Sequence, residues 1–184
     1  MVEQVDKRRE DIELNKQTYI QNAIDNIDQY KRVKGHEVTL YHQFRSCIQP
    51  YDCVYEEGTY GTILFDIKFN ATMANAYFNA FGGAIAFAMD LVAVMGIYAF
   101  TRQWGVTLKF NIDFLNAVKL NKDLKGKVTV TKLSKKVAFV LVTLLDPENN
   151  NTALAQSSLV CMLTDNSQVK LEENSNFEEI TQLN

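Results

Sequence analysis

The feature that most limits how this chain can fold is an apolar run over residues 82–100 (GGAIAFAMDLVAVMGIYAF), which contains a single charged residue, Asp90. A helix of this length could cross a bilayer. An aspartate near the centre of such a span costs about 3 kcal/mol on insertion scales, and the remaining segments are amphipathic and need an apolar partner. We therefore predict a helix that is apolar on all sides because a sheet encloses it.

Four segments after this run have the alternating or apolar patterns of β-strands. They cover residues 106–114, 124–130, 137–145 and 153–163. The polar turns between the last three segments contain Ser134-Lys135-Lys136 and residues 147–151. This order predicts neighbouring antiparallel strands joined by short connections.

Two more strands are predicted before the run, over residues 37–44 and 62–69, where the pattern also has a period of two. The segment 45–59 between them contains Pro50 and Gly58 among mixed polar residues, which predicts a loop. One antiparallel sheet wrapped around the long helix is the simplest arrangement of these elements.

The first part of the chain has a different character. Residues 5–33 contain neither Gly nor Pro, and apolar side chains recur at helical spacing in their second half. We predict an amphipathic helix that ends near Gly35. The chain of 184 residues then divides into a helical extension (1–36), one α+β domain (37–165) and a polar, acidic tail (166–184).

Composition limits the classes of partner. The formal net charge of −3 offers no general attraction to nucleic acid. Three cysteines are too few and too irregular for a disulfide framework, which favours a reducing compartment. His36, His42, Cys47 and Cys53 share one stretch, but neither pair has a zinc-finger spacing, so we expect no metal. We also expect no redox cofactor.

A set of motifs recurs in a fixed order along the domain. The run 75–83 (NAYFNAFGG) is followed by Asp90, then by Gly105-Val106-Thr107, and later by 133–139 (LSKKVAF). This set resembles the hotdog-fold thioesterases of the small eukaryotic and phenylacetate-pathway type. The resemblance covers about residues 37–165 and rests on the order and spacing of the motifs. It implies a hotdog fold and the hydrolysis of acyl-CoA.

The resemblance also assigns catalytic residues. The family pattern places an asparagine, a His-Gly-Gly, an acid and a Ser or Thr where this chain has Asn75, Gly82, Asp90 and Thr107. It departs at Phe81, which stands where the family has a histidine that helps to orient the asparagine. This substitution predicts a weakened rate.

The same residues suit thioester hydrolysis on chemical grounds. Negative charge develops on the carbonyl oxygen, and backbone N–H groups exposed by Gly82 and Gly83 at a helix start can receive it. Asn75 can donate one more hydrogen bond, and Asp90 is the only charged side chain in the apolar run. Eight residues of helix correspond to about 12 Å, so one helix cannot bring both groups to one carbonyl. The site is therefore predicted between two copies, with Asp90 and Thr107 of one facing Asn75 and Gly82 of the other.

Substrate-binding roles are predicted for Phe81 and Gly83 at the helix start. They are also predicted for Lys135 and Lys136, because related enzymes approach CoA phosphates near the equivalent turn. Lys132 is a weaker candidate. A plainer structural role is the alternative for each residue: a turn cap for Asn75, close packing for the glycines, and a solvated turn for the lysines.

Two functions from different classes fit these observations, with acyl-CoA or another chain of the same fold as the partner. The first is an acyl-CoA thioesterase that works as a homo- or hetero-oligomer through the hotdog sheet. The second is a non-catalytic hotdog subunit of a larger assembly, such as a mitochondrial respiratory complex; Phe81 and the polar additions at both ends favour it. The expected compartment is the mitochondrion, with the cytoplasm as the alternative. A dehydratase of the same fold fits less well, because its catalytic histidine is absent near the helix.

Overall fold

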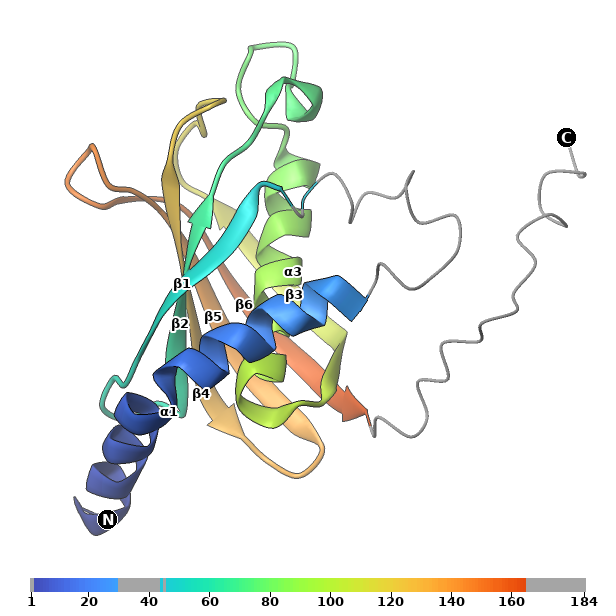
Figure 1. Cartoon of the computed structure of the whole chain (residues 1–184). Helices are drawn as coiled ribbons and strands as arrows, with labels where there is room; N and C mark the ends of the chain where they lie inside the picture. The colour runs from blue at the N-terminus through green and yellow to red at the C-terminus, as the bar shows by residue number, and fades with distance from the viewer. Residues whose placement is uncertain (1, 30–43, 45, 165–184) are drawn as a thin grey trace, which may run out of the picture.

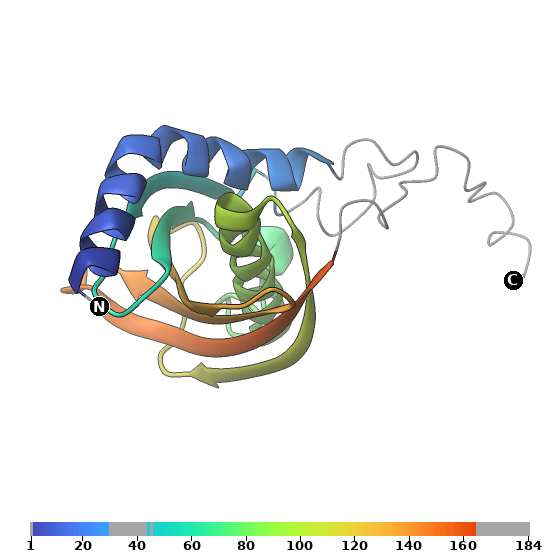
Figure 2. The ribbon, with the colours of Figure 1, turned by 90° about the horizontal axis from the view of Figure 1, so that it is seen from below.

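The computed structural model describes residues 2–29, 44 and 46–164 (Figure 1). Six strands form one antiparallel sheet in the order β1-β2-β4-β5-β6-β3, which curves around the helix α3 (Figures 1 and 2). The helix α1 adds a further layer. The elements are α1 (Val2–Gln29), β1 (Ile48–Val54), β2 (Gly61–Ile67), the 3-10 turn η3 (Ala71–Met73), α3 (Gly82–Thr101), β3 (Trp104–Phe114), β4 (Leu124–Leu133), β5 (Val137–Asp146) and β6 (Thr152–Thr164).

The prediction of a buried central helix is confirmed. Every residue from Leu91 to Ala99 is buried, and the sheet passes so close that a Cβ added to Gly96 would lie 2.6 Å from Cγ1 of Val128. By length and composition α3 could span a membrane, but 67% of its most apolar window is buried inside the protein. The apolar run therefore serves as the core around which the strands close.

The four strands predicted after the helix are also confirmed. In β5 the side chains alternate between the core and the outer face: Ala138, Val140 and Val142 are buried, whereas Phe139 and Leu141 are exposed. This alternation is what a sheet with one covered face requires. The strand β3 lies at an edge of the sheet and pairs only with β6 among the described strands.

The prediction of a loop over residues 45–59 is wrong for Ile48–Val54, which form the edge strand β1. The misleading residue is Pro50, which has no N–H to donate and is tolerated at an edge or a bulge. The register of β1 against β2 shifts between Pro50 and Asp52, so the strand accommodates the proline at an irregularity. The strand predicted over 37–44 lies outside the described residues except for Phe44, which is buried, and so does the tail 166–184.

The predicted N-terminal helix is confirmed as far as Gln29. It lies against the side of α3 that the sheet leaves open (Figure 2), where Asn22 Nδ2 donates a hydrogen bond to the Ala99 carbonyl at 2.9 Å. The polar first turns are held by Arg8, whose Nε donates to the Tyr60 carbonyl at 2.8 Å and whose guanidinium lies 4.0 Å from the Tyr60 ring centroid. This part of α1 therefore rests on the domain through a hydrogen bond and a cation–π contact, and the fully buried Ile12 packs into the core one turn later.

Candidate active site

The structure brings Asp90 and Thr107 together, two of the residues to which the resemblance assigns catalytic roles. Asp90 lies halfway along α3, and Thr107 lies on the neighbouring strand β3. The Thr107 hydroxyl donates a hydrogen bond to Asp90 Oδ1 at 2.7 Å. Both side chains are half-buried, so the carboxylate is held in the wall between the helix and the sheet.

A third residue, Cys161, completes this cluster and was not predicted from the sequence. It lies on β6 directly opposite Thr107, and its Sγ is 3.9 Å from the Thr107 hydroxyl oxygen. Cys161 is fully buried, and burial raises the pKa of its thiol, with the Asp90 carboxylate acting in the same direction. The contact depends on the register of β3 against β6, which the sequence alone does not provide.

The start of α3 offers unused backbone donors. Phe81 is the N-cap, with extended backbone (φ −67°, ψ 137°), and its carbonyl accepts from the N–H groups of Ala84 and Ile85 at 2.9 and 3.1 Å. The N–H groups of Gly82 and Gly83 make no hydrogen bond to any residue that the structure describes. Such groups carry the positive end of the helix dipole and can receive a carbonyl or oxyanion.

Two phenyl rings flank these donors. A Cβ added at Gly82 would lie 3.5 Å from Phe114 Cζ, and one added at Gly83 would collide with the Phe81 ring. Both rings are largely exposed, at 57% for Phe81 and 53% for Phe114. The glycines therefore leave the backbone open between two apolar surfaces.

Asn75 is oriented by the backbone. Its Oδ1 accepts hydrogen bonds from the N–H groups of Tyr77 at 2.9 Å and Asn79 at 3.2 Å. This is the turn-capping role that was open from the sequence. It leaves the side-chain N–H groups of Asn75 as donors, and it fixes their direction without help from residue 81.

The two parts of the predicted site are apart within one chain. Asp90 follows Gly82 by eight residues in an uninterrupted helix, which corresponds to about 12 Å of rise. One carbonyl carbon cannot lie beside both groups at this separation.

The candidate CoA-binding lysines lie at the opposite end of the sheet from the start of α3 (Figure 1). Lys135 and Lys136 form the turn between β4 and β5, and Lys132 is near the end of β4. All three are exposed, and none makes an ion pair with a described residue. The turn is close in register to Thr107, because Ala138 pairs with Cys161, which pairs with Thr107.

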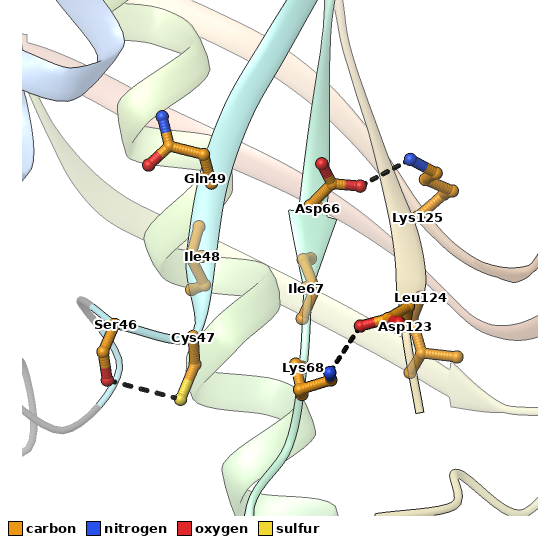
Figure 3. A pocket seen from close by; sticks show the side chains of 10 residues that line it. All are labelled: Ser46, Cys47, Ile48, Gln49, Asp66, Ile67, Lys68, Asp123, Leu124 and Lys125. Atoms are coloured by element: carbon orange, nitrogen blue, oxygen red, sulfur yellow. Dashed lines mark hydrogen bonds and ion pairs between the residues drawn. The ribbon is translucent and has the colours of Figure 1, made fainter. Parts of the chain in front are cut away.

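A separate cavity of ≈ 480 Å³ lies at the ends of β1, β2 and β4 (Figure 3). Ion pairs join Lys68 to Asp123 at 2.6 Å and Lys125 to Asp66 at 2.5 Å on its wall. These pairs balance the charge of the wall. No predicted site residue lines this cavity, so it is distinct from the cluster around Asp90.

The sheet wrapped around a central helix defines the hotdog class of folds, and solved structures of that class match this chain. The zebra fish thioesterase superfamily member 2 matches with a TM-score of 0.60 and 21% identity, covering 77% of this chain and 98% of its own. A Streptococcus mutans UA159 protein bound to acetyl CoA matches with a TM-score of 0.53 and 19% identity, covering 64% and 88%. A hypothetical thioesterase from Streptococcus pneumoniae TIGR4, solved with coenzyme A, matches with a TM-score of 0.54 and 20% identity, covering 64% and 88%.

The family model described as "Thioesterase superfamily" matches residues 79–153, which run from just before α3 to the start of β6. The search of curated proteins finds no match. The structural similarity shows the hotdog fold, and the family match shows thioesterase-superfamily similarity over the segment that contains Gly82, Asp90 and Thr107.

Proposed function

We propose that two chains of this fold form an acyl-CoA thioesterase site, in which Asp90 of one chain faces the start of α3 of the other. The observation that carries this proposal is the hydrogen bond from Thr107 to Asp90, because it holds a carboxylate in the helix wall at the position that the resemblance assigns to catalysis. The match of residues 79–153 to the thioesterase superfamily supports the same reaction class.

The chemistry follows from the groups in each half. The N–H groups of Gly82 and Gly83 and the side-chain amide of Asn75 receive the thioester oxygen as it becomes negative. Asp90 acts either as a base that takes a proton from the attacking water or as the nucleophile itself. Breaking the C–S bond releases the CoA thiolate, which is then protonated. When water is the attacking group this step leaves the free acid; when Asp90 is the nucleophile it leaves a mixed anhydride, which a water molecule hydrolyses to the free acid and the Asp90 carboxylate.

Exposed apolar side chains in two places support a second copy. Tyr77 and Phe78, in the loop before α3, are each 83% exposed, and Phe78 has a left-handed backbone (φ 57°) that is unfavourable for an aromatic residue. On the edge strand β3, Val106 and Leu108 are 46% and 59% exposed. Exposed apolar residues beside a strand edge that has no partner among the described strands are typical of a surface that another chain covers.

Phe81 makes slow turnover the expected behaviour. A phenyl ring cannot donate the hydrogen bond that an imidazole could offer to the substrate carbonyl. The same observation favours the second candidate, a hotdog subunit that binds a partner chain without catalysis. Retention of Asp90, Thr107 and the unused N–H groups leads us to place hydrolysis first.

The most direct test of the oxyanion role removes one N–H without disturbing the helix. Gly82 is the first helical residue, where proline is well tolerated, and the preceding Phe81 already has the extended backbone that proline requires. We expect Gly82→Pro to lower kcat for acyl-CoA hydrolysis about 100-fold.

The matched control is Gly82→Ala, which keeps the N–H and places its Cβ at an ordinary contact distance from Phe114. We expect it to stay within a few-fold of the wild type. Equal rates for the proline and alanine variants would exclude the oxyanion role, and a wild type that hydrolyses no acyl-CoA would favour the non-catalytic subunit.

A further inference from the structure

The cluster around Asp90 contains a thiol whose role the resemblance does not assign. Thr107 lies between the two other members, with its hydroxyl oxygen 2.7 Å from Asp90 Oδ1 and 3.9 Å from Cys161 Sγ. The pairing of β3 with β6 sets Thr107 and Cys161 directly opposite each other. The Thr107 hydroxyl group therefore makes both contacts, and the pairing of β3 with β6 fixes the position of the Thr107 backbone.

Counting protons determines the direction of both hydrogen bonds. A threonine hydroxyl carries one hydrogen, and an ionised carboxylate can only accept. The Thr107 hydrogen is therefore committed to Asp90, and Thr107 can only accept from Cys161. The thiol must be the donor, and it can be, because burial raises the pKa of Cys161 and keeps the thiol protonated at neutral pH.

We propose that Cys161 is a positioning residue for the site, and that its S–H group orients the Thr107 hydroxyl toward Asp90. As a consequence, the two carboxylate oxygens of Asp90 have different roles. Thr107 holds Oδ1, whereas Oδ2 has no hydrogen-bond partner among the described residues and is left to act on water or on the thioester. The catalytic meaning of this arrangement rests on the proposed thioesterase function, but the hydrogen bond itself does not.

Cys161 can both fill the wall and donate a hydrogen bond, and the second property distinguishes it from an apolar residue at this position. A fully buried thiol beside a hydroxyl fills the wall as a small apolar group and still offers one weak donor. Donation into the Thr107 oxygen strengthens the bond that Thr107 makes to Asp90, because hydrogen bonds in a chain polarise one another. An alanine at position 161 would fill part of the same space without restricting the hydroxyl.

The first arm of the test is the infrared S–H stretching band of the purified full chain, assigned to Cys161 by its disappearance in Cys161→Ala. We expect this band to move to higher frequency in Thr107→Val, which replaces the hydroxyl with a methyl group of similar size, and to return toward its original position in Thr107→Ser. The band of Cys53, a fully buried thiol on β1, serves as the internal control and should not move. An unchanged Cys161 band in Thr107→Val would overturn the proposal.

The second arm is kinetic and separates positioning from packing. Loss of the thiol donor in Cys161→Ala should lower kcat about five-fold with KM unchanged, and Cys161→Ser, which restores a donor, should recover part of the loss. A shifted band with kcat unaffected by either substitution would also overturn the positioning role. If the wild type has no turnover, the thioesterase proposal fails, and the infrared band alone decides whether Cys161 orients Thr107.

Discussion

The two halves of α3 differ in how far the rest of the described chain covers them. From Leu91 to Ala99 the helix is buried on all sides, whereas its first turn presents exposed backbone at Gly83 and the exposed ring of Phe81. The second half of α3 therefore holds the fold, and the proposed function assigns the exposed first turn to the substrate and the second chain.

The largest expected effect is a difference in the free energy of unfolding between substitutions in the two halves of α3. Ile97→Ala removes a fully buried side chain and should lower the free energy of unfolding by about 2–5 kcal/mol, because it loses transfer energy and leaves a cavity. Phe81→Ala, at a residue 57% exposed, should change the free energy of unfolding by about 0.5 kcal/mol or less. Urea unfolding of both variants measures the contrast, and equal losses would show that the first turn is as integral to the core as the second half.

A smaller effect on stability is expected when glycine is replaced by alanine at two positions of α3. Gly96→Ala would bring a Cβ to 2.6 Å from Val128 Cγ1, a buried and branched side chain that cannot rotate away, so we expect a net loss of about 1 kcal/mol despite the gain in helix propensity. Gly83→Ala meets only the exposed ring of Phe81, which can turn into solvent, so the propensity gain should leave stability unchanged or slightly higher. The contrast is measured by the difference in Tm, and a larger loss at Gly83 would contradict it.

The same division explains how much could be predicted from the sequence. The buried helix and the strands after it follow from hydrophobic periodicity, because a covered face imposes a regular pattern on residues such as those of β5. The edge strand β1 could not be predicted, because a proline is typical of loops and the shift in strand register that accommodates Pro50 is not visible in the sequence. Edges and bulges are set by contacts between strands rather than by local pattern.

At the candidate site, the family resemblance proposed residues but not their contacts. It assigned roles to Asp90 and Thr107, which remain predictions, and the structure shows a hydrogen bond between the two side chains. Cys161 was missed because it is near Thr107 only through strand register. The dependence of Asn75 on residue 81 was inferred from the family pattern, whereas the backbone N–H groups of Tyr77 and Asn79 hold its Oδ1 in this chain.

The measurement that tests the central claim most directly is complementation between two defective chains. Asp90→Asn and Gly82→Pro each damage a different half of the proposed shared site. In a mixed dimer, one of the two sites would combine the intact Asp90 of one chain with the intact Gly82 of the other. Random pairing of equal amounts makes half of the dimers mixed, so co-expression should restore about one quarter of the wild-type acyl-CoA hydrolysis. Activity that does not rise above that of the two variants measured separately would contradict a site shared between two copies.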